Sequence, residues 1–170
     1  MAHTACLATY PTEMASLAAM QLATFILAAA NFLFPGKDHA AFAQAAANVI
    51  ESEAPLFDKD EDRHKTAALI AAIAYRESGF KLDAVGDHGQ SVCAMQIRWG
   101  SKELLTDPEA CIRTAMGKLR KSFQGCPAHP LAIYAGGSQG CSQTKAQRVS
   151  FDRVYLSKRV LGNVQVTASE

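Results

Sequence analysis

One carboxylate, Glu77, follows a long apolar segment and is the side chain of this sequence best suited to acid–base chemistry. Residues 67–75 are almost entirely apolar, and Gly79 is suited to the left-handed conformation that ends a helix. Glu77 is therefore expected in the last turn of a buried helix. Burial disfavours the charged form of a carboxyl group, which suits a residue that must donate a proton near neutral pH.

The segment after Glu77 changes from apolar to polar and is expected to bring the chain back towards this carboxyl group. Residues 81–91 are polar and rich in glycine, and residues 92–97 form a short apolar run typical of a strand. Two further acids, Asp83 and Asp87, lie in this tongue, six and ten positions after Glu77. The order is therefore a helix, an acid, a flexible tongue and a returning strand.

Short motifs in this region and beyond it resemble, in their order, those of soluble lytic transglycosylases and goose-type lysozymes. The family pattern is roughly E-S-x-F, a tongue of small residues, G-L-M-Q, a helix start with D-P-E-x-N-I, and A-Y-N-A-G. This chain has, in the same order, E-S-G-F at 77–80, A-V-G at 84–86, C-A-M-Q-I at 93–97, L-T-D-P-E-A-C-I-R within 104–113 and L-A-I-Y-A-G-G at 131–137. The resemblance covers residues 66–137.

The resemblance implies a mainly α, lysozyme-like fold with a small β-tongue or hairpin beside the active-site cleft. The catalytic domain is expected to comprise residues 61–170, with the alanine-rich helical segment 1–60 packing on it or preceding it. The implied activity is cleavage of peptidoglycan glycan strands between N-acetylmuramic acid and N-acetylglucosamine, without a cofactor or a metal ion. Glu77 would act first as the acid and then as the base.

By the same resemblance, four further residues are expected at the substrate. Met95 and Gln96 would line the sugar cleft, and Tyr134 would hydrogen-bond near the acid and the N-acetyl group of the substrate. Ser91 would lie close to the acid. Trp99, the only tryptophan, is expected to be buried after the strand rather than to stack on a sugar.

Three positions depart from the family pattern. Cys93 stands where the family has glycine, Ala94 replaces leucine, and Ala135 replaces the asparagine of A-Y-N-A-G. Cys93 can tie the strand down through a disulfide, whereas the two alanines alter substrate fit or signal lost activity.

The alternative to an enzyme is a structural component of a phage particle, with this fold but without turnover. Its partners would be other virion proteins, and Cys6 is available for an intermolecular bridge.

The number of participating acids decides between two reactions. Goose-type lysozymes supply further acids from the tongue and hydrolyse the bond, whereas lytic transglycosylases use the single glutamate. Asp87 is either such an acid, positioning water, or a turn residue, for which aspartate beside glycine is common. The turn interpretation is favoured, and with it the transglycosylase reaction. Glu77 also has a non-catalytic alternative, an ion pair with Arg76 or Lys81.

Length, charge and cysteine content limit the class of protein. The 170 residues suit one domain, and a formal net charge of +1 gives no indication of a nucleic-acid partner. Five cysteines predict two disulfides and a spare thiol, and so an oxidising location outside the cytoplasm or in a phage virion. Five buried thiols are the alternative. No metal site is expected, because no C-x-x-C pair occurs and the histidines are scattered.

The first third of the chain is expected to be helical. Residues 1–13 lack the basic region of a signal peptide. Residues 14–34 carry no charge and are interpreted as a buried helix in preference to one that inserts into a membrane, because polar residues interrupt them. This helix should end at Pro35, and a second should run over 38–52. The acidic run 58–62 is expected to begin the helix of the acid.

The second half is expected to contain three more helices. Asp107 and Pro108 are typical of an N-cap and a first helical residue, for a helix that continues to Phe123. A short helix follows and ends at Gly136, and the last helix covers 148–160.

The first two of these helices would be antiparallel neighbours, and this arrangement predicts a disulfide pairing. The start of one would lie near the end of the other, so Cys111 and Cys141 are expected to approach within disulfide distance. Cys93 and Cys126 would then form the second pair by elimination.

Overall fold

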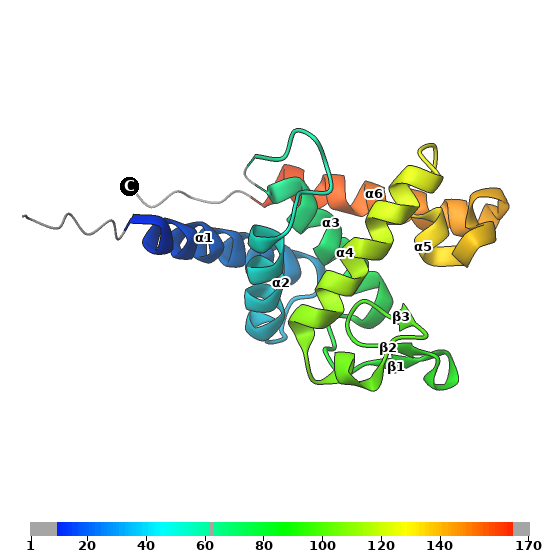
Figure 1. Ribbon diagram of the computed structural model, residues 1–170, viewed down its shortest axis with the longest axis horizontal. Helices are drawn as coiled ribbons and strands as arrows, with labels where there is room; N and C mark the ends of the chain where they lie inside the picture. The colour runs from blue at the N-terminus through cyan, green and yellow to red at the C-terminus, as the bar shows by residue number, and fades with distance from the viewer. Residues whose placement is uncertain (1–9, 62, 165–170) are drawn as a thin grey trace, which may run out of the picture.

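Six α-helices, three short 3₁₀ helices and one small antiparallel sheet are the regular elements of the part of the chain that the computed structural model describes, residues 10–61 and 63–164 (Figure 1). Of residues 10–16 only the backbone is described. The expectation of a mainly helical protein with a small β element is confirmed. The helices are α1 (Tyr10–Leu33), α2 (Ala40–Ser52), α3 (His64–Ser78), α4 (Pro108–Gly125), α5 (Ala132–Gly136) and α6 (Thr144–Asn163).

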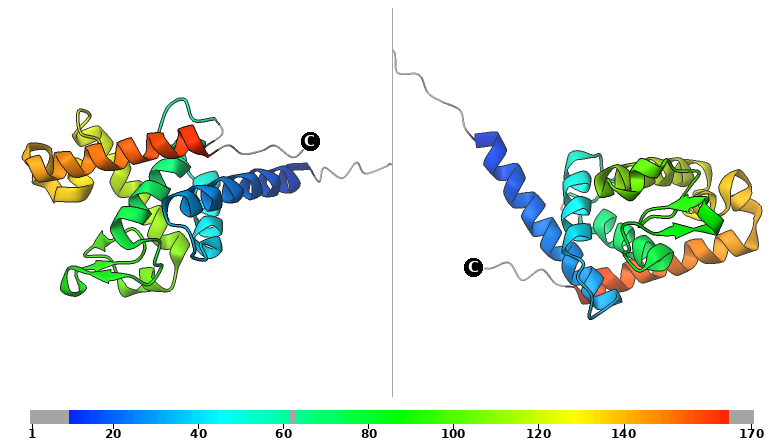
Figure 2. Two further views of the ribbon diagram at one scale, coloured as in Figure 1. Left: turned by 180° about the vertical axis from the view of Figure 1, so that it is seen from behind. Right: turned by 90° about the horizontal axis from the view of Figure 1, so that it is seen from below.

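Helix α3 lies at the centre of the molecule and is enclosed by its neighbours. Nine consecutive residues, from Thr66 to Ala74, are buried. A helix buried on every side must be apolar all round, which explains the absence of any charge in this stretch. Helices α1, α2 and α6 pack directly on α3, and α6 runs across it along one side of the molecule (Figure 2).

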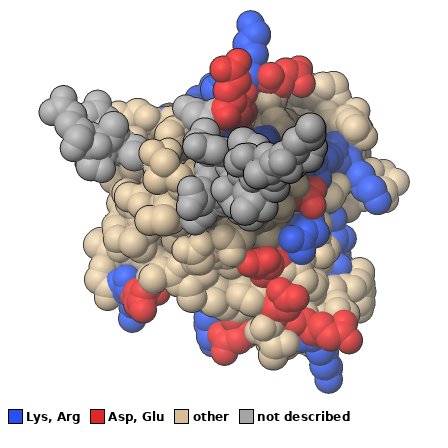
Figure 3. All heavy atoms as spheres, turned by 60° about the vertical axis from the view of Figure 1, so that its left-hand side comes forward, with Lys and Arg blue, Asp and Glu red and all other residues tan. Residues whose placement is uncertain are grey.

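The uncharged segment 14–34 lies almost entirely in α1, which begins before it at Tyr10 and ends where proline and glycine predict. The helix stops at Leu33, two residues before Pro35, and Gly36 adopts a left-handed conformation with a φ of 79°. Phe25 and Ile26 are buried in the core. In Figure 3 the left-hand part of the face shows few charged side chains, whereas acidic and basic side chains gather at its upper, right-hand and lower edges. Among the described residues, no helix combines the length and the apolar character that crossing a bilayer needs.

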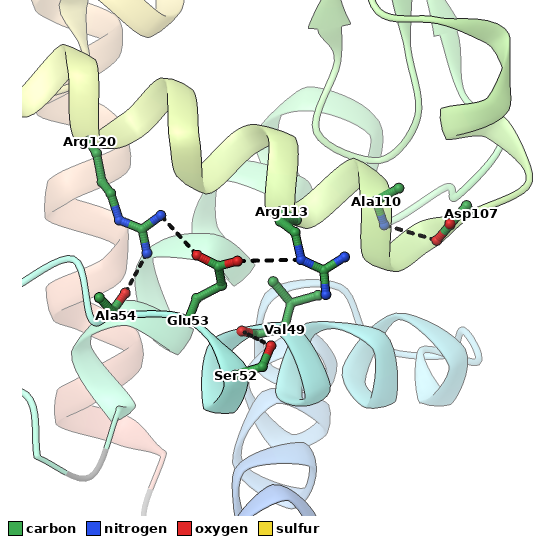
Figure 4. Close-up of polar contacts among 8 residues, drawn as sticks. All are labelled: Val49, Ser52, Glu53, Ala54, Asp107, Ala110, Arg113 and Arg120. Carbon is green, nitrogen blue, oxygen red and sulfur yellow. Dashed lines mark hydrogen bonds and ion pairs between the residues drawn. The ribbon is translucent and has the colours of Figure 1, made fainter.

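A charged cluster joins the end of α2 to α4 (Figure 4). Glu53, directly after α2, accepts a hydrogen bond from Nη1 of Arg120 (3.2 Å) and lies 3.4 Å from Nε of Arg113. Arg120 also donates through Nη2 to the carbonyl oxygen of Ala54 (2.6 Å). One carboxylate thus engages two arginines of α4 and fixes this helix against the N-terminal helices.

Helix α4 begins as its sequence predicts. Pro108 is its first residue, and Oδ1 of Asp107 accepts a hydrogen bond from the N–H of Ala110 (2.9 Å), as an N-cap does (Figure 4). The helix continues to Gly125, two residues beyond the expected end. Helix α6 begins at Thr144 and ends at Asn163, and so is longer than the expected 148–160 at both ends.

The acidic run before α3 supplies one buried cap. Asp60 is 2% exposed, and its carboxylate accepts the N–H groups of Lys65 and Thr66 at 2.8 Å each. A negative charge at this end of a helix is stabilised by unpaired N–H groups and by the helix dipole. The carboxylate therefore fixes the point at which the central helix begins.

The tongue forms a three-stranded antiparallel sheet, β1 (Val85–Gly86), β2 (Ser91–Val92) and β3 (Ile97–Arg98), in that order. The single strand expected over 92–97 is wrong, because the chain reverses within it and Val92 lies opposite both Val85 and Ile97. Cys93 and Gln96 have left-handed φ angles of 65° and 48°. The N–H of Gln96 donates to the carbonyl oxygen of Cys93 (3.0 Å) and closes the turn.

Two disulfides are present, as the cysteine count predicts, but the pairing differs from the expected one. Cys93 is bonded to Cys111, and Cys126 to Cys141. The expected pair of Cys111 with Cys141 is wrong, because Cys111 lies in the first turn of α4 and Cys126 follows its last residue. These positions are about 22 Å apart along the helix axis, and Cys141 lies at the far end. Cys6 is outside the described residues.

Each disulfide is expected to add about 3 kcal/mol to the free energy of unfolding, because it closes a loop in the unfolded chain between cysteines 18 or 15 residues apart. Replacing Cys93 and Cys111 by alanine should lower the stability measured by urea denaturation by about that amount. Peptide mapping without reduction tests the pairing. A wild-type peptide that links Cys111 to Cys141 would contradict it.

Candidate active site

A cleft of about 650 Å³ lies between the small sheet and helices α4 and α5. In Figure 1 the sheet lies below these two helices. A space of this size is typical of small-molecule sites. Its lining residues come from the end of α3 (Glu77), from the sheet and its turns (Gly86, Asp87, Ser91, Gln96, Arg98 and Trp99) and from the opposite side (Lys118, Lys121, Ile133, Tyr134, Ala135 and Gly137).

Glu77 reaches this cleft from the last turn of α3. Its side chain is 20% exposed, and Gly79 ends the helix with the left-handed φ, 61°, that the sequence predicts. Nη2 of Arg153, from the middle of α6, donates a hydrogen bond to Oε1 of Glu77 at 2.7 Å. The carboxyl group is therefore held by one buried cation and still borders an open space.

Glu77 does form an ion pair, but its partner is neither Arg76 nor Lys81, the two partners expected under the non-catalytic alternative. Arg76 pairs with Asp152 at 2.8 Å, and Lys81 lies 4.0 Å from Asp83. The side chain of residue 76 points away from that of residue 77, as successive positions on a helix do. A sequence neighbour is for this reason a poor partner for a helical carboxylate.

Arg153 is the functional candidate that sequence reasoning missed. It lies on the buried face of α6 with Leu156 and Val160, and its side chain is 10% exposed. A lone arginine at helical spacing among buried positions is itself a signal, because a buried charge needs a partner. The sequence did not indicate which acid that partner is.

Tyr134 lies in the cleft from α5, and its hydroxyl group donates to the carbonyl oxygen of Met95 (2.6 Å). Burial, followed by the negative charge of Glu77, raises the pKa of Tyr134 far above its usual value, while Arg153 acts in the opposite direction. The phenol therefore stays neutral and cannot act as a base. Met95 itself is fully buried, so the expectation that it lines the cleft is wrong. Its side chain packs in the core, and only its carbonyl group serves the site.

Gln96 lines the cleft where the sequence expects it. Its side chain crosses β1 at Gly86, where a Cβ atom would lie only 2.0 Å from Oε1 of Gln96. Nε2 of Gln96 donates to the carbonyl oxygen of Cys93 (3.2 Å). A residue larger than glycine at position 86 would therefore displace the glutamine from the sheet.

The turn that carries Gln96 is tied to the elements on either side of it. Oγ of Ser78 donates to the carbonyl oxygen of Ala94 (2.9 Å) and so joins the turn to the residue beside Glu77. The Cys93–Cys111 disulfide joins the same turn to the start of α4. The expectation that Cys93 ties this segment down is confirmed.

Asp87 has both a turn conformation and a place in the cleft. Asp87, His88 and Gly89 have successive left-handed φ angles of 49°, 55° and 91°. Oγ of Ser91, which is buried and lines the cleft, donates to Oδ2 of Asp87 at 2.7 Å. The two interpretations of Asp87 are therefore compatible, since a turn residue also presents its carboxylate to the cleft.

Trp99 is exposed, and the expectation that it is buried is wrong. Its side chain is 73% exposed, lines the cleft and lies below the guanidinium group of Arg98, 5.4 Å from the ring centroid. The position directly follows β3 and has a φ of 58°. This left-handed conformation turns the side chain out of the sheet, and the sequence gives no sign of it.

Comparisons of the chain with protein-family models, with characterised proteins and with solved structures find no match. The geometry provides the carboxyl group of Glu77 at the edge of the cleft, a second carboxylate in the lining, and polar and aromatic side chains on both sides of the cleft.

The buried ion pair should contribute to stability. Replacing Arg153 by methionine is expected to lower the free energy of unfolding by about 3 kcal/mol, because it leaves the carboxylate of Glu77 without its partner. Glu77→Gln in the same background should restore part of that loss. Arg76→Met is the matched control. It breaks an exposed pair whose side chains are both 42% exposed, and should cost less than about 1 kcal/mol. Equal losses for the two arginine variants would contradict the assignment.

The raised pKa of Tyr134 makes a prediction for alkaline pH. The folded protein keeps the phenol neutral, whereas the unfolded chain ionises it near its ordinary pKa of 10.0. The stabilisation from Tyr134 is therefore complete below pH 10 and is lost above it. Between pH 10 and pH 11 the wild type should lose about 1 kcal/mol more than Tyr134→Phe. Urea denaturation at both pH values measures this difference, and parallel losses would refute it.

Proposed function

We propose that the protein cleaves peptidoglycan glycan strands between N-acetylmuramic acid and N-acetylglucosamine, by the lytic transglycosylase reaction. The observation that carries this proposal is the carboxyl group of Glu77, presented by the end of a buried helix at a cleft of about 650 Å³. The helix, the acid, the sheet and the helices that follow have the order that the lysozyme-like resemblance implies. We therefore propose a lysozyme-like fold as well.

The first step is a proton transfer from Glu77 to the glycosidic oxygen. The bond from C1 of the muramic acid sugar to that oxygen breaks, and the second sugar leaves with a free hydroxyl group. The substrate's N-acetyl oxygen attacks C1 and carries the positive charge as a cyclic oxazolinium ion. The carboxylate left on Glu77 is stabilised by the hydrogen bond from Arg153 (2.7 Å).

The second step returns the proton. Glu77, now a base, removes the proton of the 6-hydroxyl group, whose oxygen attacks C1 and displaces the N-acetyl oxygen. The product is a 1,6-anhydro sugar, and Glu77 is protonated again. No water is consumed, so the reaction needs no second acid. The neutral Tyr134 and the side chain of Gln96, both in the cleft, are placed to orient the sugar.

Hydrolysis is the second candidate, because Asp87 also lines the cleft. Its carboxylate would position water for attack at C1, and the product would then be a reducing sugar. The bond from Ser91 fixes Oδ2 of Asp87 in the turn, which favours a structural role for this carboxylate. The transglycosylase reaction is therefore preferred.

The location proposed is extracytoplasmic or within a phage virion. Disulfides persist in oxidising surroundings, and both bonds lie at the cleft-forming elements. Peptidoglycan is found outside the cytoplasm, so the proposed substrate and the proposed location agree.

Glu77→Gln should reduce the clearing of purified cell-wall suspensions at least a hundredfold, because general acid–base catalysis contributes about 10²–10⁴. Asp87→Asn should retain most of the activity, since the preferred reaction needs no second carboxylate. Mass spectrometry of the released fragments should find 1,6-anhydro ends for the wild type.

Two results would change the proposal. If the wild type and Glu77→Gln clear the suspension equally, the enzymatic function is ruled out and the structural alternative is supported. Reducing ends in place of anhydro ends, together with loss of activity in Asp87→Asn, would establish hydrolysis.

A further inference from the structure

A second hollow, of about 370 Å³, lies on the N-terminal half of α6 beside the ion pair of the cleft. Arg153 lines this hollow, whereas Glu77, to which Arg153 is bonded, lines the cleft. The two spaces therefore adjoin the same ion pair. Under the proposed function, a polymer strand that is cut at Glu77 extends in both directions from it, and both spaces lie beside its ion pair with Arg153.

Cationic side chains outnumber acidic ones around the two spaces. The cleft is lined by Arg98, Lys118 and Lys121 with Glu77 and Asp87, and the hollow by Lys145, Arg148 and Arg153 with Asp152. The chain as a whole has a formal net charge of only +1. The excess of positive charge is therefore a property of this region and not of the whole molecule.

The acids of this region already have partners, and four of the cations do not. Glu77 is bonded to Arg153 and Asp152 to Arg76. Asp87 accepts the hydrogen bond from Ser91. Within residues 10–61 and 63–164, no carboxylate lies within ion-pair distance of Lys118, Lys121, Lys145 or Arg148. All four side chains are exposed. They are free to bind an anionic group of a ligand.

The glycan strand of peptidoglycan is itself uncharged, since its amino groups are acetylated and its lactyl groups are joined to peptide. Its carboxylates belong to the peptide stems. We propose that Lys118 and Lys121, on α4, and Lys145 and Arg148, on α6, bind these stem carboxylates on the two sides of the scissile bond. The inference rests on the proposed cleavage of peptidoglycan, and it makes the stem-bearing strand the preferred substrate.

The size of the effect follows from the exposure of the four cations. An exposed ion pair contributes up to about fivefold in an equilibrium constant, and salt screens it. Two such contacts should together change kcat/KM by about tenfold at low ionic strength. Most of this preference should disappear at high salt.

The test uses soluble disaccharide–peptide oligomers and the same oligomers with every stem carboxylate converted to a methylamide. The two substrates have the same glycan and nearly the same bulk, and differ in charge. The wild type should cleave the charged oligomers with a kcat/KM about tenfold higher than the amidated ones. Lys145→Gln/Arg148→Gln should lower this ratio at least about threefold.

The matched control is Lys37→Gln/Lys158→Gln, which makes the same change in net charge at residues that line neither space. Its ratio should equal that of the wild type. If the control lowers the ratio of the two kcat/KM values as much as Lys145→Gln/Arg148→Gln does, the preference comes from overall charge and the proposed binding site is wrong. If the wild type cleaves both substrates with the same kcat/KM, the inference is wrong and the proposed function still stands. Cleavage of neither substrate would overturn both.

Discussion

The contact between Glu77 and Arg153 fixes the carboxyl group of the candidate site to the last helix of the protein. It joins residues 76 positions apart in the sequence, the end of α3 and the middle of α6. An exposed pair, Arg76 with Asp152, joins the preceding residues of the same two helices. The buried pair is the stronger constraint, because a charge left unpaired at that depth is costly. It fixes α6 against the central helix, with the hollow that Arg153 lines beside the carboxyl group.

The sheet side of the cleft is built from unusual backbone conformations. Seven of the described non-glycine residues have positive φ angles, and five of them lie in the segment from Asp87 to Trp99, both included. Such conformations cost free energy, and they persist where surrounding contacts hold them. Here the contacts are the disulfide at Cys93 and the hydrogen bond from Ser78 to Ala94. The left-handed turns direct Asp87, Gln96 and Trp99 to the cleft rather than along a regular strand.

Sequence patterns predicted the features that depend on neighbours along the chain. The end of α3 at Gly79, the cap at Asp107 and the end of α1 before Pro35 all follow from local backbone preferences. The pairing of Cys111, the exposure of Trp99 and the partner of Glu77 depend on contacts between distant segments or on single φ angles. The hydrophobic periodicity of a sequence carries no information about such distant contacts or single backbone angles. Met95 shows the limit of a motif, which indicates that a residue belongs to a site but not whether its side chain or its carbonyl group serves there.

Helix α4 sets the span of the groove. One disulfide fastens the turn of the sheet to its first turn, and the other fastens the segment after α5 to its far end. Both flanks of the cleft are thus covalently attached to one helix. The disulfides restrict the movement of the two flanks relative to each other, and this restriction is established when the bonds form. A ligand that binds between the flanks meets them already in position, and its binding does not have to order them.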